Sequence, residues 1–212
     1  MELKPGETVL DYCAGNGGKT FAIASRILEP KGIEAENNIK STRSRIVAHD
    51  ISVDRLKRLS GSLGRVGILP EDISTTMGSD PLFSLSDGGA DVVLVDAPCS
   101  SSGTLRRSPS HRFELTSSIV KDFPKLQLDI LNQAAKLTKV GGRLVYSTCS
   151  ILELENEGVV DAFESSSISG KWKRWSFQER EKDDPRPHCR VLLPSLHNDS
   201  DGFFIARWIK TE

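Results

Sequence analysis

The feature that most restricts the fold is the stretch Val9–Thr20, VLDYCAGNGGKT, in which an apolar run ends at an acid and a glycine cluster follows. The apolar run predicts a buried strand, the glycines predict a tight turn, and the residues after Gly18 predict a helix. A strand that turns through glycines into a helix is typical of ligand-binding α/β folds. The stretch therefore predicts a ligand site at the carboxyl end of the first strand.

The same alternation of strand and helix continues along the 212 residues, a length that fits one domain with a full core. Apolar runs predict strands at Thr8–Leu10, Arg45–Ala48, Asp91–Val95, Arg143–Tyr146 and Phe203–Trp208. Helical spacing predicts helices at Lys19–Leu28, Val53–Leu63, Ile119–Leu137 and Glu155–Glu164, and Pro124 is tolerable only in a first turn. The alternation predicts an α/β, Rossmann-like fold, with a mostly parallel sheet and helices on both faces.

Two familiar phosphate-binding loops do not match the glycine cluster. A P-loop needs a glycine five residues before Gly18, where this chain has Cys13, and a Cβ there crowds the approach of a phosphate. The dinucleotide pattern G-x-G-x-x-G fails because Gly15, Gly17 and Gly18 have the wrong spacing. An NTP-binding protein is therefore disfavoured.

A cofactor without phosphates suits the loop better. The methionine part of S-adenosylmethionine can lie against the tight backbone at Gly15 and Gly17, with its carboxylate facing the helix N-terminus around Gly18–Thr20. Asp50 ends the second predicted strand, and its carboxylate can bond both ribose hydroxyls. The pattern favours an S-adenosylmethionine site over a simple turn followed by a helix cap.

Two of the four cysteines follow predicted central strands. Cys99 comes after Asp96-Ala97-Pro98, and Cys149 comes after Ser147-Thr148. Because ligands of open parallel sheets bind beyond the carboxyl ends of the strands, we expect both thiols, Asp50 and Asp96 at the rim that carries the glycine loop. The cysteines form no C-x-x-C pair, so metal-binding spacing is absent and free intracellular thiols are expected.

A thiol at such a rim suits methylation of cytosine at C5, a carbon that is too weak a nucleophile to take a methyl group directly. A thiolate that adds to C6 makes C5 nucleophilic, which is covalent catalysis. Asp96 is placed to assist near N3, either as an acid or by bonding the exocyclic amine. These residues alone do not rank Cys99 against Cys149 as the attacking group.

With these motifs the chain resembles the Sun/Fmu-type, RsmB-like RNA (cytosine-5)-methyltransferases over nearly its whole length. The resemblance rests on VLDYCAGNGGKT, VAHDIS, VLVDAPCSSSGTLRRSP, LQLDILNQAAKL, GGRLVYSTCSI, the ENE at Glu155–Glu157 and DGFFIARW. It implies a class I S-adenosylmethionine-dependent methyltransferase fold. It departs from the family at Gly15 and Asn16, where the family usually has Ala and Pro.

The resemblance also implies residue roles. It makes Cys149 the nucleophile and Cys99 the residue that assists product release. It implies cofactor contacts from Asp50, Asp96, an acid after the third strand and the glycine loop. For that acid Asp80 fits best and Asp72 competes, and the loop residues are Cys13, Ala14, Gly15, Asn16, Gly17, Gly18 and Lys19. We expect residues 1–212 to form a single catalytic domain that lacks the family's N-terminal RNA-binding region.

An RNA partner must be engaged by local patches, because the net charge is only −1. Arg106 and Arg107, followed by His111 and Arg112, are candidates for phosphate contacts. The segment Lys171–Trp175 alternates basic and aromatic residues, which can suit stacking on unpaired bases. Its tryptophans are more readily explained as packing a late strand into the core. The target cytosine must be unstacked, so we expect a single-stranded or loop site in rRNA or tRNA.

Other function classes stay open at this point. A non-enzymatic RNA-binding or assembly factor could keep the fold, although it need not keep both thiols. A DNA target is a further alternative. No apolar run approaches the roughly 20 residues that span a membrane. We expect an intracellular protein, and the compartment and oligomeric state are not indicated.

Overall fold

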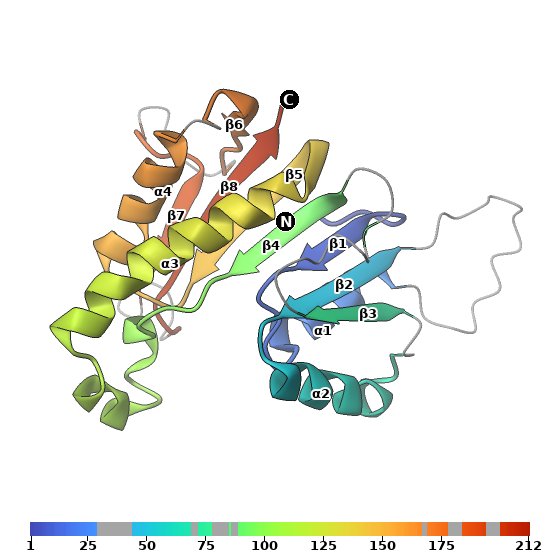
Figure 1. Cartoon of the computed structure of the whole chain (residues 1–212), viewed down its shortest axis with the longest axis horizontal. Helices are drawn as coiled ribbons and strands as arrows, with labels where there is room; N and C mark the ends of the chain where they lie inside the picture. Colours follow the sequence, from blue (N-terminus) through green and yellow to red (C-terminus); the bar gives the residue numbers. More distant parts are fainter. Residues whose placement is uncertain are drawn as a thin grey trace, which may run out of the picture.

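The computed structural model describes residues 1–28, 44–68, 72–77, 85, 89–166, 169–177, 184–193 and 200–212. These residues form an eight-stranded sheet in the order β3-β2-β1-β4-β5-β8-β6, with β7 also paired to β8 (Figure 1). The strands are β1 (Thr8–Asp11), β2 (Arg45–Asp50), β3 (Ile73–Met77), β4 (Ala90–Asp96), β5 (Thr138–Thr148), β6 (Trp172–Arg174), β7 (Cys189–Leu192) and β8 (Phe203–Lys210).

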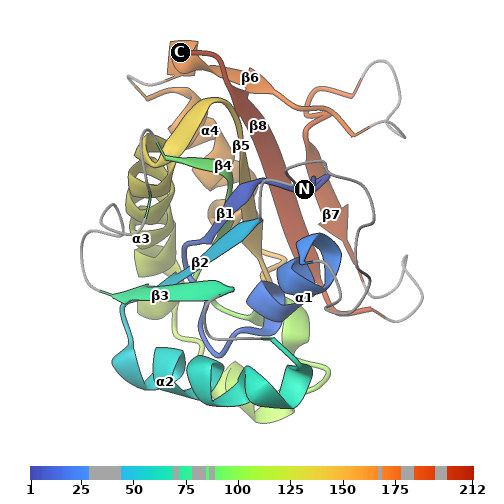
Figure 2. The ribbon, with the colours of Figure 1, turned by 90° about the vertical axis from the view of Figure 1, so that its right-hand side faces the viewer.

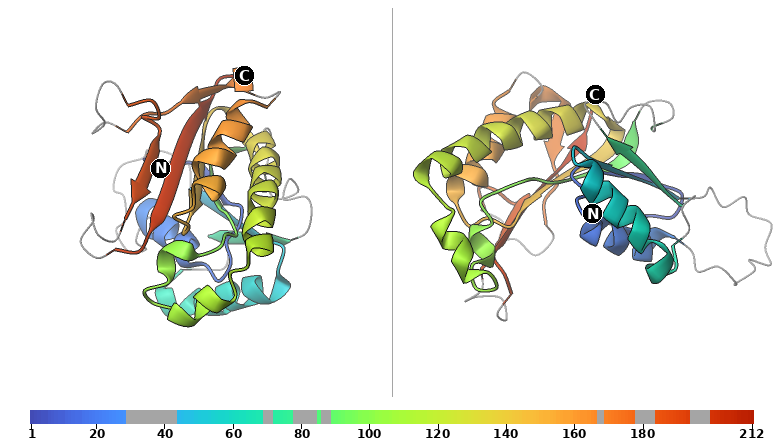
Figure 3. Two further views of the ribbon diagram at one scale, coloured as in Figure 1. Left: turned by 90° about the vertical axis from the view of Figure 1, so that its left-hand side faces the viewer. Right: turned by 60° about the horizontal axis from the view of Figure 1, so that its bottom comes forward.

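The first five strands in this order are parallel, and β8 runs antiparallel to β5. Both β6 and β7 pair antiparallel with β8, so the antiparallel strands form the edge of the sheet opposite β3 (Figure 3). The carboxyl ends of β1, β2, β4 and β5 consequently meet at one rim. This is the Rossmann-like arrangement that the strand and helix alternation predicts.

Helices cover both faces of the sheet. α1 (Gly18–Ile27) and α2 (Val53–Ser62) lie on one face, and α3 (Ser117–Lys136) and α4 (Glu157–Glu164) lie on the other (Figure 2). The side chains of β1 alternate between the two layers: Val9 packs with Ile23 of α1, and Leu10 packs with Leu131 of α3. Burial on both faces explains why the central strands are continuously apolar.

Most predicted elements are confirmed, and three predictions need correction. No bounds were predicted for β3, β6 or β7: β3 alternates buried Ile73 with polar residues at the sheet edge, and β6 and β7 are short edge strands. Pro124 lies inside α3, beyond the first turn. α3 tolerates it because the helix is 20 residues long and packs against β4, β5 and α4.

The third correction concerns the helix predicted at Glu155–Glu164. Glu155 belongs to a separate turn of 3-10 helix, Glu153–Glu155, and α4 begins only at Glu157. Among the described residues, no helix is long and apolar enough to cross a membrane.

Candidate active site

The glycine loop joins β1 to α1 through two residues with left-handed backbone, Gly15 (φ +56) and Gly17 (φ +93). A Cβ on Gly17 would lie 2.8 Å from Leu59 Cγ, so glycine is required there for packing as well as for conformation. A Cβ on Gly15 or Gly18 would meet nothing within 4 Å. The loop is therefore packed on one side and open on the other, where a ligand can approach the backbone.

Asp50 at the end of β2 holds this loop in place. Its Oδ2 accepts a hydrogen bond from the Gly15 backbone N–H at 2.9 Å, and its Oδ1 accepts one from the Ser52 N–H at 2.8 Å. The side chain is only 5% exposed. Each carboxylate oxygen has a second lone pair, so Asp50 can still accept a bond from a ribose hydroxyl.

Asp96 at the end of β4 pairs with Lys19 of the glycine loop. The distance from Lys19 Nζ to Asp96 Oδ2 is 2.5 Å, and Ser147 Oγ donates to Asp96 Oδ1 at 3.0 Å. Lys19 Nζ also lies 5.8 Å from the ring centroid of Phe203. A carboxylate, an ammonium and an aromatic face thus gather from β4, α1 and β8.

The two cysteines that follow β4 and β5 lie in direct contact. Cys99 Sγ is 3.3 Å from Cys149 Sγ, and Cys149 Sγ is 3.4 Å from Ser101 Oγ. Hydrogen bonding from the Cys99 thiol lowers the pKa of Cys149 to about 6, against the opposing effect of burial, with further lowering by Ser101. The same contact, together with burial, raises the pKa of Cys99.

The two thiols are a coupled pair, so a negative charge on one sulfur favours a proton on the other. The hydrogen bond between them favours the charge on Cys149 and the proton on Cys99. Cys13 in the glycine loop stays a thiol, because burial and the neighbouring carboxylates of Asp11 and Asp50 raise its pKa. The geometry suits one nucleophile with an adjacent proton donor.

Three parts of this site were not identified from the sequence. Ser101 has an unusual left-handed backbone, φ +55, which is typical of functional loops in non-glycine residues. Phe203 was assigned only to a strand. Glu155 is fully buried although it carries a carboxyl group, and its position after the second cysteine motif was the available signal.

The residues proposed for RNA contact differ in their exposure and in their partners within the protein. Arg106 and Arg107 are exposed, and Arg107 Nε pairs with Asp201 Oδ2 at 2.6 Å. His111 is engaged with the cysteine loop, since its Nε2 lies 3.2 Å from the Ser100 carbonyl. Trp172 packs against the core and Trp175 stacks on Arg207 at 4.0 Å, which confirms that this segment packs a late strand.

Of the two acids considered for the position after the third strand, Asp72 and Asp80, only Asp72 lies among the described residues. Asp72 precedes β3 and therefore lies at the amino end of the strand, away from the rim, so its candidacy was wrong. Asp80 lies outside the described residues. Within the described part of the chain, no group of three or more His, Cys, Asp or Glu residues is placed to hold a metal ion.

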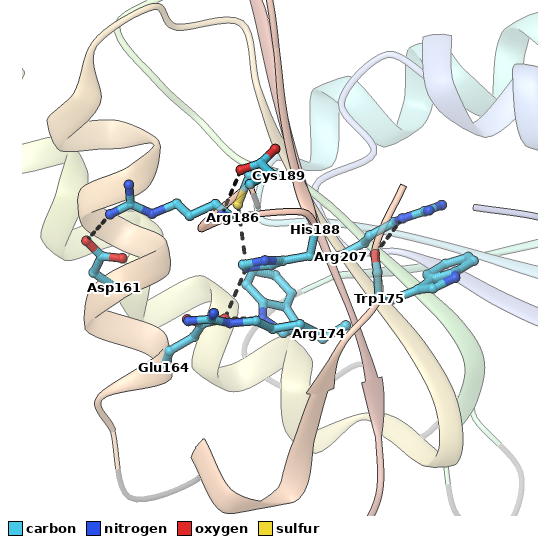
Figure 4. Close-up of polar contacts among 10 residues, drawn as sticks. Asp161, Glu164, Arg174, Trp175, Arg186, His188, Cys189 and Arg207 are labelled. Carbon is cyan, nitrogen blue, oxygen red and sulfur yellow. Dashed lines mark hydrogen bonds and ion pairs between the residues drawn. The ribbon is translucent and has the colours of Figure 1, made fainter. Parts of the chain in front are cut away.

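A second polar cluster lies at the antiparallel edge of the sheet, where α4 meets β6 and β8 (Figure 4). Glu164 of α4 accepts hydrogen bonds from Arg174 of β6 and Trp208 of β8, and it pairs with the buried His188. A cavity of about 200 Å³ adjoins this cluster and is lined by Phe163, Glu164, Trp172, Arg174 and Trp208. The carboxylate is already saturated by the protein, so it ties α4 to the antiparallel strands.

Comparison with known proteins agrees with the family resemblance that the sequence motifs indicate. Residues 1–209 match the model of the 16S rRNA methyltransferase RsmB/F family. The chain is 32% identical over 210 residues to the ribosomal RNA small subunit methyltransferase B of Serratia proteamaculans, covering 99% of this chain and 44% of that protein. It is 34% identical over 225 residues to a 28S rRNA (cytosine-C(5))-methyltransferase of Mus musculus, covering 99% of this chain and 26% of that one.

Solved structures give the same picture. The structure of NSun6 from Pyrococcus horikoshii with SFG, an analogue of S-adenosylmethionine, superposes with a TM-score of 0.73 at 27% identity, covering 97% of this chain and 48% of that one. A methyltransferase homolog from the same organism gives 0.72 at 29% identity, covering 98% and 62%. The chain spans less than half the length of the two rRNA methyltransferases above. The fold is that of S-adenosylmethionine-dependent methyltransferases, and the chain belongs to the 16S rRNA methyltransferase RsmB/F family.

Proposed function

We propose that this chain is the catalytic part of an RNA (cytosine-5)-methyltransferase that uses S-adenosylmethionine. The observation that carries the proposal is the thiol pair, Cys99 and Cys149, whose sulfurs lie 3.3 Å apart at the rim where Asp96 and Lys19 are also paired. A protein that only binds RNA has no need of a polarised pair of thiols. Relatives named for cytosine-C5 methylation of rRNA support the same reaction.

The residues at the rim fit the methyl donor. The open side of Gly15 and Gly18 leaves room against the backbone, and the N-terminus of α1 favours a carboxylate. Asp50 would hold the ribose, with Cys13, Ala14, Asn16, Gly17, Lys19, Asp80 and Asp96 as the other proposed contacts. When bound, S-adenosylmethionine supplies the methyl group as an electrophile.

Cys149 performs the first step of the proposed reaction. Its thiolate attacks C6 of the cytosine, the C6–S bond forms, and the electrons of the C5–C6 double bond make C5 nucleophilic toward the methyl group. After C5 is methylated, its proton leaves to a base, the C6–S bond breaks, and the double bond returns. The protein thereby recovers the Cys149 thiolate.

Asp96 and Cys99 have supporting roles in this scheme. The contact between Asp96 and the Lys19 ammonium favours Asp96 as an acceptor of a hydrogen bond from the exocyclic amine, rather than as a proton donor. Cys99 contacts the attacking sulfur and carries a proton, so it is placed to assist elimination of Cys149 from C6.

The class of RNA substrate follows from how a cytosine can reach the Cys149 sulfur. C6 of a stacked base cannot reach a half-buried sulfur, so the target cytosine must be flipped out or unpaired, as in a single-stranded or loop segment of rRNA or tRNA. Arg106 and Arg107 are exposed beside the cysteine loop and are the proposed phosphate contacts.

The test is methyl transfer by single-cysteine variants. Tritiated S-adenosylmethionine is incubated with unmodified transcripts of small-subunit rRNA and tRNA. Cys149→Ala should abolish transfer to C5, whereas Cys189→Ala, which removes a buried thiol of β7 that is not part of the Cys99–Cys149 pair, should retain it. Transfer by the Cys149→Ala variant would overturn the proposal.

Calorimetry separates the methyl donor from a nucleotide triphosphate. We expect the chain to bind S-adenosylmethionine and not ATP with magnesium, because Cys13 occupies the place of the first P-loop glycine. Asp50→Asn should weaken binding of the methyl donor. Binding of ATP alone would contradict the assignment of the glycine loop.

A further inference from the structure

The carboxylate of Glu155 is completely buried between the two cysteine loops. Its Oε2 accepts hydrogen bonds from the Ser100 backbone N–H at 2.8 Å and from Gln127 Nε2 at 2.9 Å. Its Oε1 accepts one from Ser150 Oγ at 2.8 Å. Ser100 directly follows Cys99 and Ser150 directly follows Cys149, so one carboxylate holds both loops one residue away from the thiols.

Three serine hydroxyls complete the connection beneath the sulfurs. Ser100 Oγ lies 3.1 Å from Ser102 Oγ and 3.2 Å from Ser150 Oγ, and Ser102 Oγ lies 3.0 Å from Ser150 Oγ. The Ile151 N–H donates to Ser102 Oγ at 3.1 Å. All three serines are buried. The loops after β4 and β5 are thus joined by polar contacts that end at Glu155.

Removing Glu155 would take an acceptor away from three buried donors. Ser100 N, Gln127 Nε2 and Ser150 Oγ would each lose a bond to the carboxyl group, and such a loss is costly when water cannot replace it. The loops can relieve this cost by moving apart to admit water. The contact between the sulfurs of Cys99 and Cys149, at 3.3 Å, is short-ranged and would weaken with that movement.

We propose that Glu155 is a positioning residue that holds the Cys99 thiol against Cys149 and so keeps Cys149 reactive. The proposal deepens the proposed function, since it rests on Cys149 as the nucleophile. Glu155 acts through Ser100 and Ser150, and it does not touch the reacting atoms. Gln127 of α3 anchors it from the other side, because Gln127 Nε2 also donates to the Pro98 carbonyl at 2.9 Å.

A purely structural role for Glu155 makes a different prediction. Loss of a structural carboxylate lowers the free energy of unfolding but leaves the chemistry of Cys149 unchanged in the molecules that stay folded. Loss of a positioning carboxylate changes the reactivity of Cys149 in folded molecules. The two are separated by a measurement on the thiol itself.

The experiment measures the rate at which iodoacetamide alkylates Cys149 as a function of pH, by mass spectrometry of the Cys149 peptide. Neither RNA nor methyl donor is added. The variants are Glu155→Ala and Glu155→Gln, whose single carbonyl oxygen can keep only part of the network. The matched control is Glu164→Gln, which removes the carboxylate that accepts hydrogen bonds from Arg174 and Trp208 at the antiparallel edge of the sheet.

The proposal expects the folded Glu155→Ala variant to be alkylated about tenfold more slowly at pH 7, because less Cys149 is thiolate. Its pH profile should move to higher pH. Glu155→Gln should fall in between, about threefold slower, by the same reasoning. Glu164→Gln should overlay the wild type. If Glu155→Ala does not fold, the isosteric Glu155→Gln carries the test.

A double variant ties the effect to Cys99. In a Cys99→Ala background, Glu155→Gln should slow Cys149 little further, since the contact that it maintains is already gone. Wild-type Cys149 profiles in folded Glu155 variants, or fully additive effects with Cys99→Ala, would overturn the proposal. If the Glu155 variants slow Cys149 alkylation as expected but the wild type transfers no methyl group to RNA, the proposed function fails and the positioning role stands. The failure of one proposal can therefore be told apart from the failure of the other.

Discussion

Asp11 carries the most direct prediction about stability. It ends β1 beneath the glycine loop and is completely buried. Thr20 Oγ1 donates a hydrogen bond to Asp11 Oδ2 at 2.7 Å, but Asp11 Oδ1 is a buried oxygen with no hydrogen-bond partner. Burial raises the pKa of Asp11 from 3.8 to about 7, and the hydrogen bond from Thr20 only partly opposes this.

The sign of the pH dependence follows from linkage. Between pH 3.8 and about 7 the folded state keeps a proton that the unfolded chain has lost. The contribution of Asp11 to stability is therefore fully present below pH 3.8 and is lost as the pH rises through 7. At about 1.4 kcal/mol for each unit, the loss has an upper limit of about 4 kcal/mol. Structural relaxation lowers the expected loss to about 2 kcal/mol.

Urea unfolding of the wild type and Asp11→Asn at pH 5 to 8 tests this reasoning. The wild type should lose stability relative to Asp11→Asn as the pH rises, since the asparagine carries no charge to bury. Cys149 titrates in the same range with the opposite sign, but both proteins contain it and it cancels in the difference. Asp91→Asn, at a half-exposed carboxylate paired with Lys139, should parallel the wild type. Parallel curves for Asp11→Asn would refute the account.

Three further predictions concern the other parts of the molecule. Burial raises the pKa of Glu164, but the hydrogen bonds from His188, Arg174 and Trp208 outweigh it and lower the pKa to about 2. Glu164→Gln should therefore lower the free energy of unfolding by about 1–3 kcal/mol at pH 7. In acid unfolding this difference should disappear as the pH falls from 4.5 to 2. Gly103→Ala places a Cβ against the backbone of Gly202 and 2.8 Å from the Cys149 carbonyl oxygen, so it should destabilise by about 1–3 kcal/mol in chemical unfolding and suppress methyl transfer, whereas Gly61→Ala in open space should do neither. Replacing Arg106 and Arg107 by Ala should weaken RNA binding and reduce the salt dependence of log K by about 1.4, and an unchanged slope in filter binding would remove them as phosphate contacts.

The central fold could be predicted because its strands are buried on both faces. β1, β2, β4 and β5 are continuous apolar runs that end at the rim, and the glycine loop marks where the first helix starts. The bounds of β3 escaped prediction because Ile73 alternates with polar residues at a sheet edge. Pro124 lies inside α3 because tertiary packing outweighs its local preference for a first turn.

The candidate site was only partly predictable for a similar reason. Strand-end residues such as Asp50, Asp96 and Cys149 can be placed at one rim from topology alone. The contact between the two sulfurs depends on loops that fold back on each other, and no periodicity describes these. Glu155 was the hardest to identify, because a glutamate between a cysteine motif and a helix is normally exposed, and only its three buried donors explain it.

The division of roles between the two cysteines is the central claim, and the Cys99→Ala variant tests it most directly. The variant is incubated with S-adenosylmethionine and unmodified rRNA transcript, and the mixture is separated on a denaturing gel. The account predicts a protein–RNA adduct that survives denaturation, because Cys149 still attacks C6 but is not released, and predicts that the adduct disappears in the Cys99→Ala, Cys149→Ala double variant. Continued turnover without an adduct in Cys99→Ala, or an adduct that persists without Cys149, would contradict the account.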